Sequence, residues 1–348
     1  MKISLLTDGI HPYVLGGMQK YAYYLCKYLA KNQVYVDLYH FIPLNSKEKN
    51  PFSDEELKYI TLIEVPWKRY KFKGHYIYEN YIFSKKIYKK FVRREKPDFV
   101  YAQGFTGWYL MKKGIRVGVN NHGYEMFQDS SLKLGLLRWG ARQTMKKADS
   151  VFSYGGKISE IIKKITSSKI IEMNNGIEEE WLTKVIVKHK KPHFLFVGRN
   201  DPRKGIENLN LALESFNGDF HFVGPLPKEK QIDKKNIFYH GKVTEKELKE
   251  IYSKCDVLVC PSYSEGMPTV ILEAMASGLA IIATDVGVVF KMVSDNGWLL
   301  ENNNPDTIKQ AMLEAVNSDL TEKRKKSLEK AKQFTWDKIV KDFLEKIK

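Results

Sequence analysis

The chain of 348 residues has no long apolar run and only three cysteines. A membrane-spanning helix needs ~20 consecutive apolar residues, and no stretch approaches that length. The N-terminal sequence MKISLLTDG lacks a signal-peptide core and a small-residue cleavage site, so we expect a cytoplasmic protein. Cys26, Cys255 and Cys260 are odd in number and lack the spacing of a zinc site, which predicts reduced thiols in the core.

Two nucleotide-binding motifs are also missing. Neither a G-x-G-x-x-G dinucleotide fingerprint nor a G-x4-G-K-[ST] phosphate-binding loop follows an expected strand. The sequence therefore gives little support to a dinucleotide-binding enzyme or to a P-loop enzyme.

Charge is abundant and unbalanced. Lys and Arg together number 57 against 41 Asp and Glu, which gives a formal net charge of +16. Basic side chains crowd the aromatic segment Trp67–Lys96. Basic residues beside Trp and Tyr suit an anionic membrane surface, and they also suit single-stranded nucleic acid. A solvated lysine-rich helix is a third interpretation, and the composition alone leaves all three open.

Short β-branched runs alternate with amphipathic segments along nearly the whole chain, which is typical of parallel sheets with crossover helices. The pattern begins with KISLLTD and restarts with PHFLFVG after the charged segment Ile177–Pro192, which we interpret as a linker. A hydrophobic content of 43% and the length of 348 residues fit two soluble domains. The prediction is an α/β protein with two doubly wound, Rossmann-like domains, 1–187 and 188–334, that face each other across a cleft. An amphipathic helix follows at 335–348.

Ligands of open α/β sheets bind beyond the carboxyl ends of the strands, so the loops that follow strands are the places to search. Gly16 and Gly17 follow the first strand and open a helix, where the backbone could approach a ligand. His122 follows a later strand and could be a base, a hydrogen-bond donor to a sugar or a structural residue. Each feature alone is also compatible with an ordinary turn or a packed side chain.

In the second half, Arg199 follows the strand PHFLFVG, and Lys204 leads into the next helix. Two cations at one edge of a sheet suit a diphosphate, Arg through its planar fork and Lys as a point charge. Glu265 follows another strand, and Glu273 lies ~8 Å further along an apolar helix expected at 267–277. A carboxylate in an apolar helix needs a compensating partner. The two glutamates therefore predict contacts with different parts of one extended ligand, unless a lysine or the backbone satisfies Glu273.

These loops, together with NNGI at 174–177 and the run HGKVTEKELKEIYSKCDVLVCPSYSEGMPTVILEAMASGLAIIATDVG, resemble the GT-B glycosyltransferases, specifically retaining glycosyltransferase family four. The resemblance spans nearly the whole chain. It is most specific in the second half, where Glu265 and Glu273 match the paired-glutamate signature of the family. It implies a GT-B fold with an acceptor-binding domain at 1–187 and a donor-binding domain at 188–334. The helix at 335–348 resembles the segment that returns to the first domain.

The resemblance also implies roles for single residues. Arg199 and Lys204 match the cationic pair on the donor diphosphate, Glu265 matches the glutamate near the transferred sugar, and Glu273 matches the one that binds the nucleotide ribose. His122 matches the histidine beside the reacting sugar. The expected catalytic residues are therefore His122, Arg199, Lys204 and Glu265. The remaining expected contacts are Gly16, Gly17, Val243, Gly266 and Met267 with the donor, and Glu125 with the acceptor.

Three positions depart from the pattern of the family. The sequence FVGPLP around Gly224 lacks a second glycine, Lys291 stands where a glutamate is usual, and Gln19 stands where an acidic residue is frequent. The first departure puts a nearby contact with the base or the phosphates in doubt.

The implied reaction transfers a hexose-type sugar, with retention, from a nucleotide diphosphate sugar to a hydroxyl of a glycan or lipid-linked acceptor, in cell-surface polysaccharide or glycolipid synthesis. Arg199 and Lys204 would stabilise the leaving diphosphate without a metal, in agreement with the lack of Asp-x-Asp, and no cofactor is expected. We expect a peripheral site on the inner face of the membrane through residues 67–96, and no nucleic-acid partner. The rival interpretations are a sugar-nucleotide epimerase or phosphorylase of the same architecture, and a basic nucleic-acid- or membrane-binding module.

Overall fold

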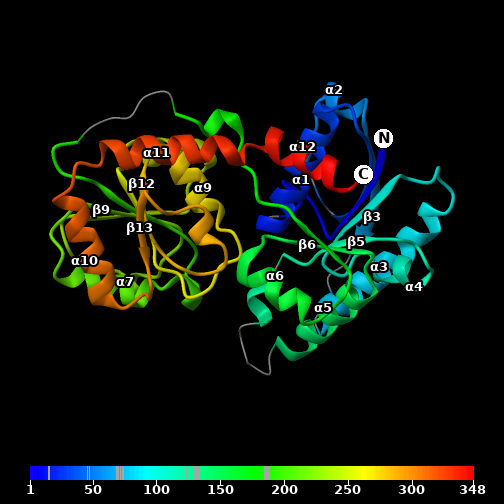
Figure 1. Cartoon of the computed structure of the whole chain (residues 1–348), viewed down its shortest axis with the longest axis horizontal. Helices are drawn as coiled ribbons and strands as arrows, with labels where there is room; N and C mark the ends of the chain where they lie inside the picture. Colours follow the sequence, from blue (N-terminus) through cyan, green and yellow to red (C-terminus); the bar gives the residue numbers. More distant parts are fainter. Residues whose placement is uncertain are drawn as a thin grey trace. The chain divides into compact units, whose positions relative to one another are not determined.

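The computed structural model describes residues 1–14, 16–44, 46, 48–67, 70, 72, 74–122, 124–127, 134–183 and 189–348. The chain divides into two compact units (Figure 1). Unit 1 comprises Met1–Asn174 and Trp336–Lys348, and unit 2 comprises Asn175–Thr335. No helix in these described ranges is both long and apolar enough to cross a bilayer.

The boundary between the units differs from the expected 187–188. The Nδ2 of Asn175 donates to the carbonyl oxygen of Met267 at 2.7 Å, and Ile177 forms a parallel bridge with Thr335. The amide of Thr183 donates to the carbonyl of Ala276 at 2.9 Å. These bonds attach the first part of the expected linker to unit 2, while residues 184–188 of that linker lie outside the described residues.

Unit 1 is built on a seven-stranded parallel sheet in the order β3-β2-β1-β4-β5-β6-β7. Its strands are β1 Lys2–Thr7, β2 Tyr35–Pro43, β3 Ile60–Trp67, β4 Phe99–Gln103, β5 Gly118–Asn120, β6 Ser150–Ser153 and β7 Lys169–Glu172. Its helices are α1 Gly17–Lys31, α2 Asp54–Leu57, α3 His75–Phe91, α4 Trp108–Lys112, η1 Tyr124–Phe127, α5 Gly135–Lys147, α6 Gly156–Lys163 and α12 Trp336–Lys346.

The last helix, α12, packs on the first helix of unit 1 (Figure 1). Its buried side chains recur at helical spacing, as expected of an amphipathic helix; they are Trp336, Ile339, Val340 and Phe343. The ring of Trp336 lies 5.2 Å from that of Tyr21, and Lys31 forms a 2.9 Å ion pair with Asp337. The C-terminal segment is therefore part of the core of unit 1.

Unit 2 is built on a six-stranded parallel sheet in the order β10-β9-β8-β11-β12-β13. Its strands are β8 Phe194–Val197, β9 Phe220–Val223, β10 Ile237–Gly241, β11 Val257–Cys260, β12 Ala280–Thr284 and β13 Gly297–Leu300. Its α-helices are α7 Ile206–Glu214, α8 Glu245–Ser253, α9 Thr269–Ala276, α10 Pro305–Val316 and α11 Thr321–Ala331. Its 3-10 helices are η3 Glu179–Trp181, η4 Pro202–Lys204, η5 Lys228–Lys230, η6 Val289–Lys291 and η7 Lys332–Phe334.

Helices cover both faces of the sheet of unit 2, with α7 and α10 on one face and α9 and α11 on the other (Figure 1). Phenylalanines of β8 and β9 alternate along the strands and pack under α7 and α10. The two doubly wound parallel sheets confirm the predicted fold class. Cys26, Cys255 and Cys260 are buried and form no disulfide, which confirms their prediction as core thiols.

Candidate active site

The strand order of unit 2 creates a topological switch point between β8 and β11. From β8 the chain continues to β9 on one side, whereas β11 lies on its other side. Connections that leave in opposite directions open a crevice at the carboxyl edge of such a sheet, where ligands of open α/β folds bind. The loops at 198–205 and 261–268, which hold most of the predicted donor residues, follow these two strands.

Lys204 and Glu265 meet at this carboxyl edge of the sheet. The Nζ of Lys204 lies 2.6 Å from Oε1 of Glu265, and the hydroxyl of Ser262 donates to the same oxygen at 2.7 Å. Burial by itself lowers the pKa of Lys204, but the negative charge of Glu265 and its hydrogen bond outweigh burial and hold the pKa above its ordinary value. Lys204 is therefore a fixed cation at the end of β8.

Arg199 lies on the same loop, and its side chain is exposed. A Cβ added to the neighbouring Gly198 would lie 3.8 Å from Cγ of Lys204, so the lysine side chain runs back along the end of β8. The structure thus brings Lys204 against Glu265 and leaves Arg199 exposed on the loop that carries Lys204. An exposed guanidinium on the same loop as a fixed ammonium suits an anion that arrives from solvent.

Glycines allow the loops at this edge of the sheet to pack closely against each other. Gly287 has a φ of 58°, and a Cβ there would overlap the carbonyl oxygens of Glu265 and Gly266. Gly205 has a φ of 70°, and its Cβ would overlap the carbonyl of Pro261. Both positions need the left-handed backbone that glycine adopts without strain, so glycine holds the loops after β8 and β11 in place.

The backbone around Gly266 and Met267 engages other loops of unit 2 through its carbonyl oxygens. The carbonyl of Gly266 accepts from the amide of Val288 at 3.1 Å, and the carbonyl of Met267 accepts from Asn175. The amides of Gly266 and Met267 donate to no protein group in the ranges that the structure describes. These two amides precede α9, where the helix dipole also favours negative charge.

Glu273 is buried in α9, as the sequence indicated, and Tyr252 of α8 donates to its Oε2 at 3.2 Å. Burial first, and then the charge of Glu273, raise the pKa of Tyr252 well above its usual value, so the phenol remains a donor. The helix is shorter than the expected 267–277, because Pro268 is extended with a ψ of 118° and serves as the N-cap.

Two other expected positions of unit 2 lie further along the edge of the sheet. Val243 follows β10, which is separated from β8 by β9. Gly224 follows β9 with a φ of 123°, and a Cβ there would overlap the carbonyl of Gly198. The shortened loop at Gly224 therefore packs directly against the base of the loop that carries Arg199.

In unit 1, His122 follows β5 and is fixed by two partners. Its Nε2 lies 2.9 Å from Nε2 of Gln103, and its Nδ1 lies 3.0 Å from the hydroxyl of Tyr154. Gln103 in turn accepts from the hydroxyl of Thr7 at 2.7 Å. Burial lowers the pKa of His122 to about 3, so the imidazole is neutral near pH 7. Both ring nitrogens are engaged, which favours a positioning or hydrogen-bonding role over that of a base.

Gly16 and Gly17 have different surroundings. A Cβ on Gly16 would overlap Oε1 of Gln19, whose Nε2 donates to Asp8 at 2.8 Å. A Cβ on Gly17 would meet nothing within 4 Å, so packing inside unit 1 does not require glycine at this position. Glu125 lies in η1, and its side chain is outside the described part of the chain.

Sequence reasoning missed the partners that hold these residues. Ser262 and Tyr252 fix the two glutamates of unit 2, and Gln103 and Tyr154 fix His122 of unit 1. Ser262 and Gln103 stand at or just beyond the carboxyl end of a strand, so the rule that located the loops could have found them. Tyr154 also directly follows a strand, β6, whereas nothing in the local pattern marks Tyr252 of α8.

Comparison with known families agrees with this geometry. The model of the group 1 glycosyl transferases matches residues 177–334, and the model of glycosyltransferase family 4 matches residues 15–181. The two matches divide the chain close to the boundary between its two units. The chain belongs to the family-four glycosyltransferases and has the GT-B fold.

Known relatives and structures cover almost all of the chain. An uncharacterised glycosyltransferase of Methanocaldococcus jannaschii is 28% identical, over 98% of this chain and 96% of its own length. Sucrose-phosphate synthase from Thermosynechococcus elongatus superposes with a TM-score of 0.81 at 18% identity, covering 99% of this chain and 97% of its own. HepE of Anabaena, solved with UDP and glucose, gives 0.69 at 16% identity, covering 99% of this chain and 98% of its own. The two solved structures establish the fold.

Proposed function

We propose that this glycosyltransferase moves a hexose-type sugar from a nucleotide diphosphate sugar to a hydroxyl of a glycan or lipid-linked acceptor, with retention at the anomeric carbon. The proposal rests mainly on the pair formed by Lys204 and Glu265 at the switch point of unit 2. A cation and a carboxylate at one spot provide contacts for a phosphate and for sugar hydroxyls.

The diphosphate is the group whose charge grows as the sugar leaves. Lys204 supplies a fixed positive charge and Arg199 an exposed one. The amides of Gly266 and Met267, which donate to no group in the described part of the chain, supply further donors. Preorganised donors of this kind stabilise charge that develops in the transition state. We therefore propose that these side chains and amides do this work, with neither a metal ion nor a cofactor required.

Glu273 is proposed to bind the ribose of the nucleotide. Its carboxylate has two oxygens, and Tyr252 donates to one of them. A carboxylate accepts about four hydrogen bonds in all, so two neighbouring ribose hydroxyls can donate to it as well. This arrangement accounts for a buried carboxylate in an otherwise apolar helix.

No protein nucleophile is assigned. We propose that the acceptor hydroxyl attacks from the face that the diphosphate leaves, and that the leaving phosphate takes the proton of that hydroxyl. In this scheme the neutral His122, held by Gln103 and Tyr154, lies beside the transferred sugar. Its low pKa suits a hydrogen-bonding group better than a proton acceptor near pH 7.

The first test measures thermal stabilisation of the full chain by UDP, GDP and ADP. Binding to the folded state alone stabilises by ~2.7 kcal/mol at a hundredfold excess over the dissociation constant, and we expect at least one diphosphate to stabilise. Lys204→Ala should abolish the shift, and the exposed Lys228→Ala should keep it. If no diphosphate stabilised the protein against thermal unfolding, the proposed nucleotide site in unit 2 would be wrong.

The second test uses the sugar form of the stabilising nucleotide with glycan and lipid-linked hydroxyl acceptors. NMR of the product should show the anomeric configuration of the donor. A product of opposite configuration would contradict retention. An epimer formed from the donor alone, or a product that requires inorganic phosphate, would favour an epimerase or a phosphorylase.

A further inference from the structure

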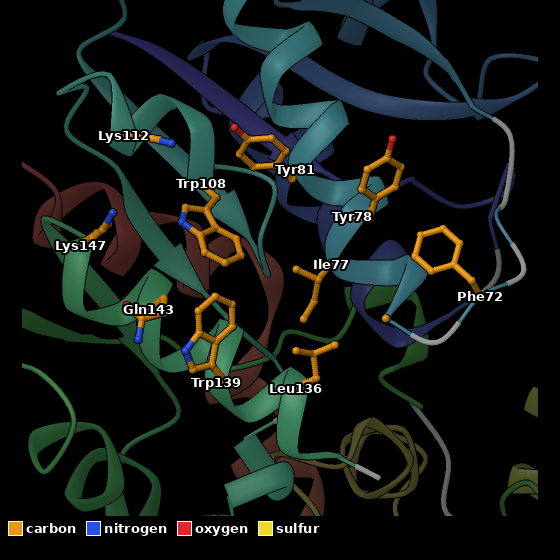
Figure 2. A pocket seen from close by; sticks show the side chains of 11 residues that line it. Phe72, Ile77, Tyr78, Tyr81, Trp108, Lys112, Leu136, Trp139, Gln143 and Lys147 are labelled. Carbon is orange, nitrogen blue, oxygen red and sulfur yellow. The ribbon is translucent and has the colours of Figure 1, made fainter. Parts of the chain in front are cut away.

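Unit 1 has an open groove of about 690 Å³ on the surface formed by α3, α4 and α5 (Figure 2). Its walls are mainly aromatic and aliphatic, with lysines at the rim. The lining residues are Phe72, Gly74, Ile77, Tyr78, Tyr81, Trp108, Lys112, Leu136, Trp139, Gln143 and Lys147. The groove lies far along the chain from the loops of the candidate active site in unit 2, and none of its residues has a role in the proposed reaction.

Large apolar side chains of this groove are exposed to solvent. The exposed fractions are 51% for Trp139, 48% for Leu136 and 44% for Tyr78. The rings of Trp108 and Trp139 lie 5.7 Å apart and form the middle of the groove (Figure 2). Contiguous apolar surface of this kind marks an interaction site, and exposed Trp and Tyr are enriched where a protein meets the membrane interface.

The wall is a product of close packing between α3 and α5. Gly74 precedes α3 with a φ of 85°, and a Cβ there would approach Cδ2 of Leu136 to 2.7 Å. The glycine thus lets the start of α3 lie against the start of α5. Without this approach Leu136 would not line the same groove as Ile77 and Tyr78, both of α3.

The charged side chains on the outer surface of these three helices have one sign. The basic residues of the three helices are Lys85, Lys86, Lys89, Lys90, Lys112, Arg138, Arg142, Lys146 and Lys147. The carboxylate of these helices, Glu79, is buried and accepts from the amide of Tyr70 at 2.7 Å and contacts Nδ1 of His75 at 3.0 Å. The outer surface of the helices is therefore cationic.

The two ends of the groove differ in chemistry. Figure 2 shows Lys112 and Lys147 at one end, Trp108 and Trp139 in the middle and Phe72 toward the other end. An anionic head group beside the two lysines would leave an attached hydrocarbon chain over the aromatic rings. A nucleic acid would instead place charge along its whole length.

We propose that this groove binds an acyl chain of an anionic membrane lipid, and that the surface formed by α3, α4 and α5 lies on the lipid bilayer. The proposed contact surface differs from the one expected from Trp67–Lys96 alone. Trp67 stacks on Phe41 at 5.4 Å and does not line the groove, whereas α4 and α5 supply both central tryptophans. This inference does not depend on the proposed reaction.

The test is co-sedimentation of the full chain with vesicles of phosphatidylglycerol and of phosphatidylcholine. We expect binding to the anionic vesicles only. The double variant Trp139→Ser/Leu136→Ser should weaken this binding by about tenfold or more, because two exposed apolar side chains lose their burial in lipid. Lys112→Gln/Lys147→Gln should also weaken it, and more so at low salt than at high salt.

Matched controls come from unit 2. Leu211 is 52% exposed on α7, so Leu211→Ser removes a similar apolar side chain outside the groove. Lys228→Gln/Lys309→Gln removes the same charge outside it. Both controls should bind vesicles like the wild type. All variants should keep the wild-type melting temperature and nucleotide-induced stabilisation, which separates loss of membrane binding from loss of the proposed reaction.

A second measurement reports how deeply Trp139 enters the lipid bilayer. Lipids brominated along the acyl chain should quench the fluorescence of the wild type, and Trp139→Phe should keep vesicle binding while losing part of the quenching. Unchanged binding of Trp139→Ser/Leu136→Ser would overturn the proposal in favour of a solvated basic surface. Equal binding to neutral vesicles would also overturn it, as would binding of a single-stranded oligonucleotide that the same double variant abolishes.

Discussion

The ammonium group of Lys204 lies 2.6 Å from Oε1 of Glu265, although 61 residues separate them in the chain. The family resemblance implies that these residues contact different parts of a donor, the diphosphate and the sugar. In the structure they contact each other, so a phosphate bound at Lys204 would compete with Glu265 for its ammonium group. Donor binding should therefore release the carboxylate of Glu265 toward the sugar.

Glu265→Gln separates the two roles of this pair. The amide keeps the shape of the side chain and removes the charge that neutralises Lys204, so nucleotide diphosphate affinity should hold or rise. Turnover should fall by roughly a hundredfold, the scale of ~3 kcal/mol for one preorganised polar contact. Calorimetric titration and initial rates measure the two effects. Lys204→Ala is the matched comparison and should lose both nucleotide affinity and turnover. Weaker nucleotide binding by Glu265→Gln would contradict the competition between phosphate and Glu265 for Lys204.

Gly17→Ala tests whether the glycine at this position allows a ligand to approach the backbone. A Cβ at Gly17 meets no protein atom within 4 Å, so stability should change by no more than ~1 kcal/mol. If the donor approaches the backbone here, kcat/KM should fall by tenfold or more on the scale of ~1.4 kcal/mol.

The control for this change is Gly135→Ala, which also replaces the first residue of a helix, α5, with only one side-chain atom 4.0 Å away. It should leave both stability and kcat/KM near wild type. Equal activities of the two variants would show that nothing approaches Gly17. Urea unfolding and initial rates provide the measurements.

Gly287→Ala tests the support beneath Glu265. Both Gly287 and Gly241 have a left-handed backbone, with φ values of 58° and 63°. A Cβ at Gly241 meets nothing within 4 Å, whereas one at Gly287 overlaps two carbonyl oxygens. Gly241→Ala should cost ~1 kcal/mol of unfolding free energy, and Gly287→Ala should cost about 3 kcal/mol or more. Equal losses of unfolding free energy for the two variants in urea would show that the loop after β11 shifts to accommodate the added Cβ at little energetic cost.

Acid should destabilise unit 2 through His221. Burial, followed by the nearby His240 and His193, lowers the pKa of His221 to about 4 in the folded protein, while Asp219 opposes the shift and Lys254 adds to it. An unfolded histidine has a pKa of about 6.5, so the unfolded state binds more protons between these values. Stability is therefore retained above about pH 6.5 and lost as the pH falls toward 4.

The comparison with His221→Asn isolates this residue from the other histidines and the carboxylates. Unfolding free energies measured in urea from pH 8 to about 4 should show a constant difference between the two proteins at high pH. The wild type should then lose stability relative to the variant below about pH 6.5. Parallel curves would assign the acid sensitivity to other groups.

Much of the fold and of the donor site follows from short-range pattern. Alternating strand and helix signals predicted both parallel sheets, and the positions just after the strands predicted Arg199, Lys204 and Glu265. These features depend on backbone periodicity and on the common direction of parallel strands, which a local stretch of sequence records. The boundary at Asn174–Asn175 was missed, because it depends on hydrogen bonds from Asn175 and Thr183 to residues distant in the chain.

The sequence by itself determined the α/β class, the family, the loops that carry the candidate donor residues and the excess of basic side chains. Only the tertiary structure decided that β8 lies beside β11, which brings Lys204 to Glu265, and that Tyr252 reaches Glu273. It also decided that α3, α4 and α5 share an aromatic groove. Strand order and helix packing depend on contacts between residues far apart in the chain, and no local spacing encodes them.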